Sequence, residues 1–181
     1  MDTDIHEMNN NRMKLIGFIL LLIFFMRLLF PSIVNDLKSH WTLGLDDQGG
    51  VTDSCLPWSL FFVSHDNISA SSIHVGTIVQ FKPPQAISKI YGNVEVIKII
   101  AAIPGDKVKI LSNGIWINGK YWGGMWLLPY LKALNQTITT PKSYTVPPGF
   151  YLTLGTSPDS YDSRYWGLIP YSSITGIAHP L

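Results

Sequence analysis

Lys98 is the residue whose setting most clearly suggests chemistry. It lies in Val94-Glu95-Val96-Ile97-Lys98-Ile99-Ile100-Ala101-Ala102-Ile103, a run rich in β-branched residues that predicts a strand. In a buried strand the ammonium loses its hydration, so the pKa falls from about 10.4 toward about 7 to 8. A neutral lysine can then take a proton from a hydroxyl or a thiol. The alternative is a lysine on an edge strand that faces solvent, which is the usual state of lysines.

An all-β body after about residue 42 is predicted to hold Lys98 in place. Short apolar segments are separated there by Gly, Pro, Asn and Ser, and none shows a sustained helical period. Asn-Gly pairs at 113–114 and 118–119 predict tight turns. The segment 123–141 is left unassigned, with a short helix or a surface insertion open for 127–131. The predicted strands are Leu60–Ser64, Thr77–Phe81, Val94–Ile103, Lys107–Leu111, Ile115–Ile117 and Gly149–Leu154.

The N-terminal region predicts a membrane anchor over residues 15–34. An apolar run from Leu15 to Met26 continues after Arg27 to Val34, which gives about twenty residues, the length of a bilayer-spanning helix. Arg27 lies near the end of this span, where a long side chain can reach the headgroups. A cleaved signal peptide is the alternative, but no clear small-x-small cleavage site follows the run.

The flanking charges predict the orientation of this anchor. Arg12 and Lys14 precede it, so the positive-inside rule keeps residues 1–14 in the cytoplasm. The β body, residues 42–181, would then lie in the periplasm, on a single-pass protein of a bacterial inner membrane.

Composition narrows the function classes. The chain has 181 residues, room for one domain of ordinary size, and a formal net charge of +1 with no basic cluster, which argues against nucleic-acid binding. Its one cysteine, Cys55, excludes an internal disulfide and a zinc site built from cysteine spacing. The five histidines show no ligand spacing. No metal and no cofactor are expected.

Two segments together resemble type I signal peptidases, membrane-anchored serine/lysine proteases that remove leader peptides from exported proteins. Residues 98–108 resemble the lysine segment of that family. Ser160-Tyr161-Asp162-Ser163-Arg164-Tyr165-Trp166-Gly167 resembles its Ser-x-Asp-Ser-Arg-x-x-Gly block, and residues 147–155 resemble the strand that leads into it. The similarity covers most of residues 50–178. It implies a mainly β, compact signal-peptidase-like body of coiled antiparallel sheets on one transmembrane helix.

The nucleophile is predicted within Thr52-Asp53-Ser54-Cys55-Leu56-Pro57, where two registers are open. The general family spacing makes Ser54 the nucleophile. The register of the conjugative-transfer (TraF-like) branch, Ser-x-Pro-x-Gly-x-Tyr, puts Cys55 there instead. A thiol is the more acidic group and needs less help from a base. Ser54 is slightly favoured because the rest of the pattern implies a Ser/Lys pair. The structural alternative makes Cys55 a small buried residue and Ser54 a turn residue.

The resemblance also implies roles for the remaining residues. Ser160 would orient the Lys98 amine. Thr52 would help the nucleophile's own N–H to hold the oxyanion in the Ser54 register. Asp162 and Arg164 would form a structural ion pair. This chain departs from the family at Gly155-Thr156-Ser157-Pro158, where Gly-Asp-Asn is common, and at Ile99, where arginine is common.

The sequence thus predicts an endopeptidase that cleaves leader peptides through an acyl-enzyme. A compact body on one anchor is similar to the conjugative-transfer branch, so the expected substrate is a pilin or another exported precursor. The expected partners are this substrate and the lipid bilayer, with no nucleic acid. Two alternatives stay open: a non-catalytic envelope assembly component that retains the fold, and a housekeeping signal peptidase of broad range. Oligomeric state and cleavage site are left open.

Overall fold

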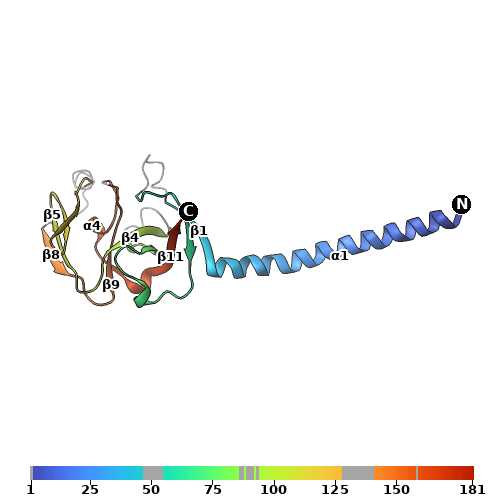
Figure 1. Ribbon diagram of the computed structural model, residues 1–181, viewed down its shortest axis with the longest axis horizontal. Coiled ribbons are helices and arrows are strands. Elements are labelled where there is room, and N and C mark those ends of the chain that lie inside the picture. The colour runs from blue at the N-terminus through green and yellow to red at the C-terminus, as the bar shows by residue number, and fades with distance from the viewer. Residues whose placement is uncertain are drawn as a thin grey trace. The chain divides into compact units, whose positions relative to one another are not determined.

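The computed structural model describes residues 2–46, 55–85, 88, 92, 94–127, 141–157 and 159–181, with side chains described from residue 17 onward. The chain divides into two compact units, Met1–His40 and Trp41–Leu181 (Figure 1). The predicted site residues Thr52 and Ser54, and most of the unassigned segment after residue 127, lie outside the described residues.

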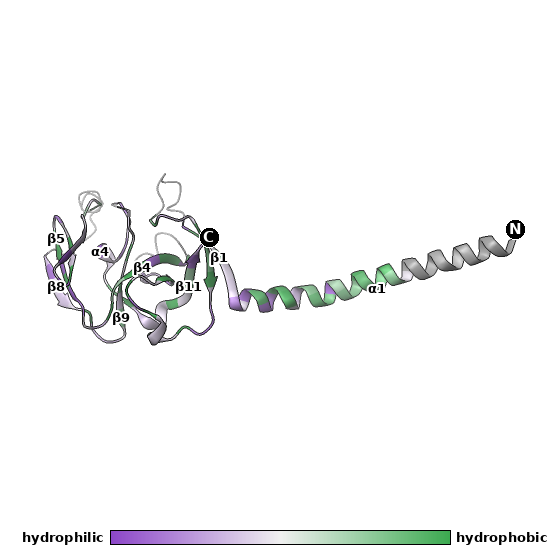
Figure 2. Cartoon of the chain, in the orientation of Figure 1, coloured by the Kyte–Doolittle hydropathy of each residue, from purple (hydrophilic) through white to green (hydrophobic). Residues whose placement is uncertain are grey.

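The first unit is one long helix, α1 (Asp2–His40). Its part Gly17–His40 contains an 18-residue stretch with a mean hydropathy of 2.4 and is long and apolar enough to cross a membrane (Figure 2). The helix extends beyond the predicted anchor at both ends, because helical hydrogen bonding does not require apolar side chains. Pro31 lies inside it and lacks only its own N–H donor. A signal sequence near the N-terminus meets the same criteria of length and apolar composition, so retention of the anchor stays a prediction.

The second unit consists of two antiparallel sheets (Figure 1). The larger sheet has, in spatial order, β1 (Trp41–Leu45), β2 (Leu60–Ser64), β11 (Ile174–Pro180), β3 (Ile78–Phe81), β4 (Val96–Ala102), β9 (Phe150–Leu154) and β10 (Ile169–Pro170). The smaller sheet has β7 (Lys120–Gly123), β6 (Gly114–Ile117), β5 (Lys107–Leu111) and β8 (Lys142–Thr145). Short helices η1 (Ala70–Ser72), α4 (Ser163–Trp166) and η2 (Tyr171–Ser173) lie in the connections. The predicted mainly β architecture is confirmed.

The core follows from the alternation of apolar residues along the strands. In β5, Val108 and Ile110 are buried while Lys107 and Lys109 are exposed, so one face of the smaller sheet is apolar. This face packs with Leu154 of β9 in one cluster. Two further clusters lie on the larger sheet. Strand β4 contributes to all three clusters and is therefore covered on both faces.

All six predicted strands are confirmed, with ends that differ by at most two residues. Sequence patterns missed β1, β7, β8, β10 and β11. These strands are short or carry glycine and proline, such as Gly176 in β11, and strand β8 has no fully buried residue. Their conformation is fixed by pairing with neighbours rather than by their own composition.

Both predicted tight turns are confirmed, and the first consists of Ser112 and Asn113, with Gly114 as the first residue of β6. Asn118 and Gly119 both have positive φ, 50° and 78°, as the turn requires. In contrast, Gly114 is paired with Leu111 inside β6. A Cβ at residue 114 would lie 2.6 Å from Cε2 of Tyr121 and 2.9 Å from the carbonyl oxygen of Gly123. Glycine is present there because β7 packs closely, not because the turn demands it.

Candidate active site

Lys98 lies in an interior strand, and its side chain is buried. Strand β4 pairs with β3 on one side and with β9 on the other, so the reading of Lys98 as an edge-strand residue is wrong. The side chain is 2 % exposed, and no carboxylate in the described part of the chain forms an ion pair with it. The neutral amine itself stays a prediction.

Cys55 lies next to the Lys98 amine. The pKa of its thiol is raised, because burial disfavours the thiolate, while the nearby side chains of Lys98 and Ser160 act in the opposite direction. Cys55 is 3 % exposed. Of the two predicted nucleophiles it is the one within the described residues, and its thiol reaches the candidate base.

Ser160 completes the cluster. It is fully buried, and its Oγ has no hydrogen bond of ordinary geometry within the described part of the chain. A buried hydroxyl without a hydrogen-bond partner costs free energy, and in native proteins such groups are often part of a functional site. This hydroxyl lies near the Cys55 thiol. Its predicted role in orienting the Lys98 amine stays a prediction.

The backbone of Cys55 is held by the segment that follows β9. Its carbonyl oxygen accepts hydrogen bonds from the N–H of Thr156 at 2.9 Å and of Ser157 at 3.1 Å. On the other side, Asp46 follows β1, and its carboxylate accepts from the N–H of Leu56 at 2.9 Å. Sequence reasoning missed Asp46, because a lone carboxylate after a short strand has no distinguishing pattern.

Gly155 makes this approach possible. A Cβ at residue 155 would overlap the Oγ of Ser160 and would lie 2.8 Å from the carbonyl oxygen of Cys55. Because that oxygen belongs to the backbone, it cannot move aside without shifting Cys55 itself.

We therefore expect Gly155→Ala to lower kcat/KM for peptide cleavage by about a hundredfold or more, since displacements of about 1 Å at a reacting group have effects of this size. Gly149→Ala is the matched control. It substitutes a glycine with open space around its Cβ position, outside the cluster, although its positive φ carries a stability cost. Equal activity of Gly155→Ala and wild type would show that the cluster does not carry the chemistry.

The block after Ser160 is fastened by a buried ion pair. Arg164 donates from Nη2 at 2.6 Å and from Nε at 2.8 Å to the carboxylate of Asp162. The same carboxylate caps α4 through the N–H of Arg164 and accepts from the N–H of Gly155 at 2.9 Å. Arg164 also donates to the carbonyl oxygen of Gly124 at 2.9 Å. The pair thus connects the site segment to the loop after β7.

Asp162→Asn is expected to lower the free energy of unfolding by about 3–5 kcal/mol, because it leaves a buried guanidinium without its counter-charge. Chemical denaturation of the detergent-solubilised protein measures the change. Glu95→Gln, at an exposed carboxylate, is the control and should change stability little. A loss of activity without loss of stability in Asp162→Asn would assign this carboxylate a role in the reaction instead.

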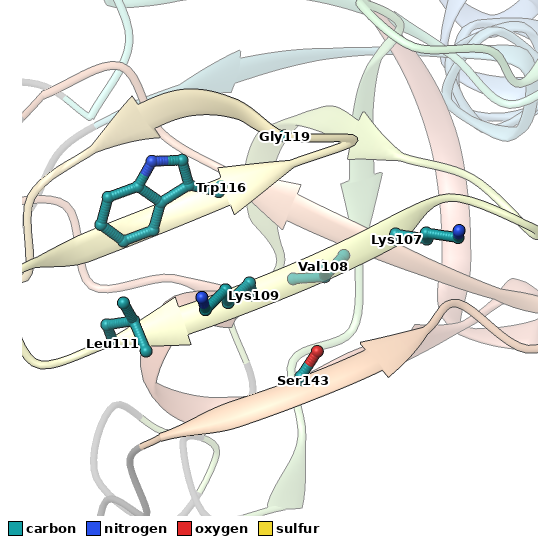
Figure 3. Close-up of a pocket in the computed structure, with 7 residues that line it drawn as sticks. All are labelled: Lys107, Val108, Lys109, Leu111, Trp116, Gly119 and Ser143. Carbon is teal, nitrogen blue, oxygen red and sulfur yellow. The ribbon is translucent and has the colours of Figure 1, made fainter.

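Two hollows on the body differ in their relation to this cluster. One lies on the smaller sheet, where Lys107, Lys109 and Trp116 share a face (Figure 3). It contains none of the cluster residues. The other lies between β1 and the strands β3 and β4, and Ile97, the neighbour of Lys98, is part of its lining.

A thiol, a buried amine and a hydroxyl in one cluster are the types of group that acyl transfer with a lysine base uses, and their roles here stay predictions. Comparison with known proteins defines the class further. The family profile described as signal peptidase, peptidase S26, matches residues 10–181. The chain belongs to this family.

Curated relatives agree with this membership. A probable signal peptidase I-2 of Synechocystis sp. is 33% identical over 110 residues, which are 57% of this chain and 45% of the relative. Signal peptidase IB of Staphylococcus aureus is 33% identical over 97 residues, 46% of this chain and 51% of that protein. The chain therefore spans about half the length of these relatives.

Among solved structures, a signal peptidase I from Enterococcus faecalis V583 is 26% identical and has a TM-score of 0.37. The match covers 57% of this chain and 94% of that one.

Proposed function

We propose that this protein is a membrane-anchored endopeptidase that removes leader peptides from exported precursors. The observation that carries the proposal is the contact between buried Lys98 and the Cys55 thiol beside Ser160, in a chain of the signal peptidase family. In this arrangement Cys55 is the nucleophile and Lys98 is the general base. Ser54, the other candidate nucleophile, lies outside the described residues.

The reaction is acyl transfer in two steps. Neutral Lys98 takes the proton of the thiol as Sγ of Cys55 attacks the carbonyl carbon of the scissile bond. The tetrahedral intermediate collapses, the C–N bond breaks, and the leaving amine takes the proton back from Lys98. Lys98 then deprotonates a water molecule that attacks the thioester. The acid product leaves, and the thiol regains its proton.

The raised pKa of Cys55 bears on how this reaction begins. Burial outweighs the two groups that lower the pKa, so the thiol keeps its proton at neutral pH when no substrate is bound. Proton transfer to Lys98 then accompanies the attack on the substrate, in place of a thiolate formed in advance. An N–H at the nucleophile, with Thr52 beside it in the Ser54 register, would hold the oxyanion.

The substrates are proposed to be pilin or related precursors of conjugative transfer. Support comes from the Cys55 register, in which Pro57 matches the proline of the conjugative-transfer branch, while Ser59 and Phe61 stand where that branch has Gly and Tyr. The apolar helix α1 supports attachment to the bacterial inner membrane, with the β body on the periplasmic side.

The decisive experiment incubates the detergent-solubilised full-length protein with a pilin precursor and with a secretory precursor, and detects the cleaved products by mass spectrometry. Cleavage of the pilin precursor supports the whole proposal, and cleavage of both indicates broad range. An activated acyl probe is tested in parallel. If no precursor is cleaved and no residue is acylated, the chain is a non-catalytic member of its family.

A further inference from the structure

The hollow between β1 and the strands β3 and β4 contains a buried polar group without a partner. The hollow has a volume of about 470 Å³. Gln80 contributes to its wall and is 8 % exposed, and its Oε1 has no hydrogen bond among the described residues. In the register of β3 and β4, Gln80 lies opposite Ile97, so both side chains are on one face of the sheet.

The position of this hollow connects it to the candidate active site. Ile97 precedes Lys98 in β4, where consecutive side chains point to opposite faces of the sheet. Ile97 belongs to the same cluster of buried side chains as Cys55. Gly44 of β1 lies over Ile97, and a Cβ there would be 2.5 Å from its Cδ1. The same strand leads to Asp46, which holds the segment of Cys55 through the N–H of Leu56. A peptide bound at Cys55 can therefore place a neighbouring side chain in the hollow.

The chemistry of the wall indicates what this side chain is. A buried amide oxygen without a partner costs free energy in the empty protein, and a ligand that donates a hydrogen bond removes this cost. The amide group of Gln80 can both accept and donate, so it complements a hydroxyl or a second amide. Lys82 and Glu95 stand at the hollow with exposed side chains. An aliphatic side chain would satisfy none of these groups.

We propose that Gln80 determines specificity at one position of the peptide substrate near the scissile bond, where it selects a short polar side chain such as Ser, Thr or Asn. This inference rests on the proposed function of the cluster at Lys98, since it concerns the same substrate. Sites built to hydrogen-bond a hydroxyl reject the analogue that lacks it, whereas purely apolar pockets discriminate weakly between isosteres.

Peptides that differ only by Thr or Val, substituted at one position at a time around the cleavage site, test this inference. These two side chains have nearly the same shape, so only the hydroxyl is probed. Wild type is expected to cleave the Thr peptide with a kcat/KM about tenfold higher at one position. Gln80→Leu should abolish the preference at that position alone. Gln85→Leu, at an exposed glutamine that is not part of the hollow, should retain it.

Binding measurements separate this inference from the proposed function. Lys98→Ala and Lys98→Ala/Gln80→Leu are titrated with the same peptides, so that affinity is read without chemistry. A Thr preference in binding that disappears with Gln80→Leu upholds the inference even if no peptide is cleaved. Gln80→Glu, which keeps an acceptor, should retain the preference and guards against misfolding of the Leu variant. No Thr preference at any position in wild type, or its persistence in Gln80→Leu, overturns the inference, as does absence of peptide binding.

Discussion

Replacing Lys98 with alanine is expected to lower kcat/KM for precursor cleavage by about a thousandfold, within the range of about 10²–10⁴ attributed to general bases. No other described residue can replace Lys98 as the base, because no other amine or imidazole of the described residues contacts the Cys55 thiol. The loss should fall mainly on kcat, since Lys98 handles protons during bond formation and bond breaking rather than holding the substrate.

Two further variants show whether the loss is chemical. Lys98→Met keeps a long apolar side chain in the interior of β4, so it should fold and should be as inactive as Lys98→Ala. Lys109→Ala removes an exposed lysine of the smaller sheet and should leave cleavage unchanged. Full activity in Lys98→Met, with intact folding shown by circular dichroism, would refute the role of the lysine as base.

The sequence alone predicted the strand around Lys98 through a local signal, the apolar β-branched residues on both sides of a lone cation, and left open whether that strand is buried or lies at an edge. Strand β4 is buried, and Lys98 is buried in it. The alternation in Lys107–Leu111 likewise predicted β5 with its buried Val108 and Ile110. Both signals are carried by consecutive residues, so they can be read without knowledge of the fold.

The contacts that assemble the cluster could not be predicted in this way. Gly155 approaches both Ser160 and Cys55. The need for glycine at this position depends on the pairing of β9 with β4, two strands that lie far apart in the sequence. Gly44 packs over Ile97 for a similar reason. Gln80 appears in the sequence as one polar residue in an apolar strand. A binding role for Gln80 becomes apparent only when β1 is placed beside it, because the two together line the hollow.

We expect Cys55, rather than Ser54, to be the nucleophile. Cys55→Ala should abolish cleavage, whereas Ser54→Ala should retain most of it. Cys55→Ser should retain a small part, because a serine hydroxyl holds its proton more tightly and depends more on the base. The adduct of an activated acyl probe should be a thioester, which neutral hydroxylamine cleaves. The opposite pattern, with an inactive Ser54→Ala and an active Cys55→Ala, would assign the nucleophile to Ser54.

Alkylation of Cys55 tests the same contact without any substrate, because the thiolate is the form that reacts. Burial raises the pKa of the thiol, so the rate with iodoacetamide should rise with pH through a midpoint above that of a free cysteine. Lys98 and Ser160 both lower this pKa. Lys98→Met and Ser160→Ala should therefore move the midpoint to higher pH, the former by more, since Lys98 lowers the pKa of the thiol more than Ser160 does. An unchanged midpoint in Lys98→Met would mean that the amine does not touch the thiol, and the catalytic pair would have to be sought at Ser54.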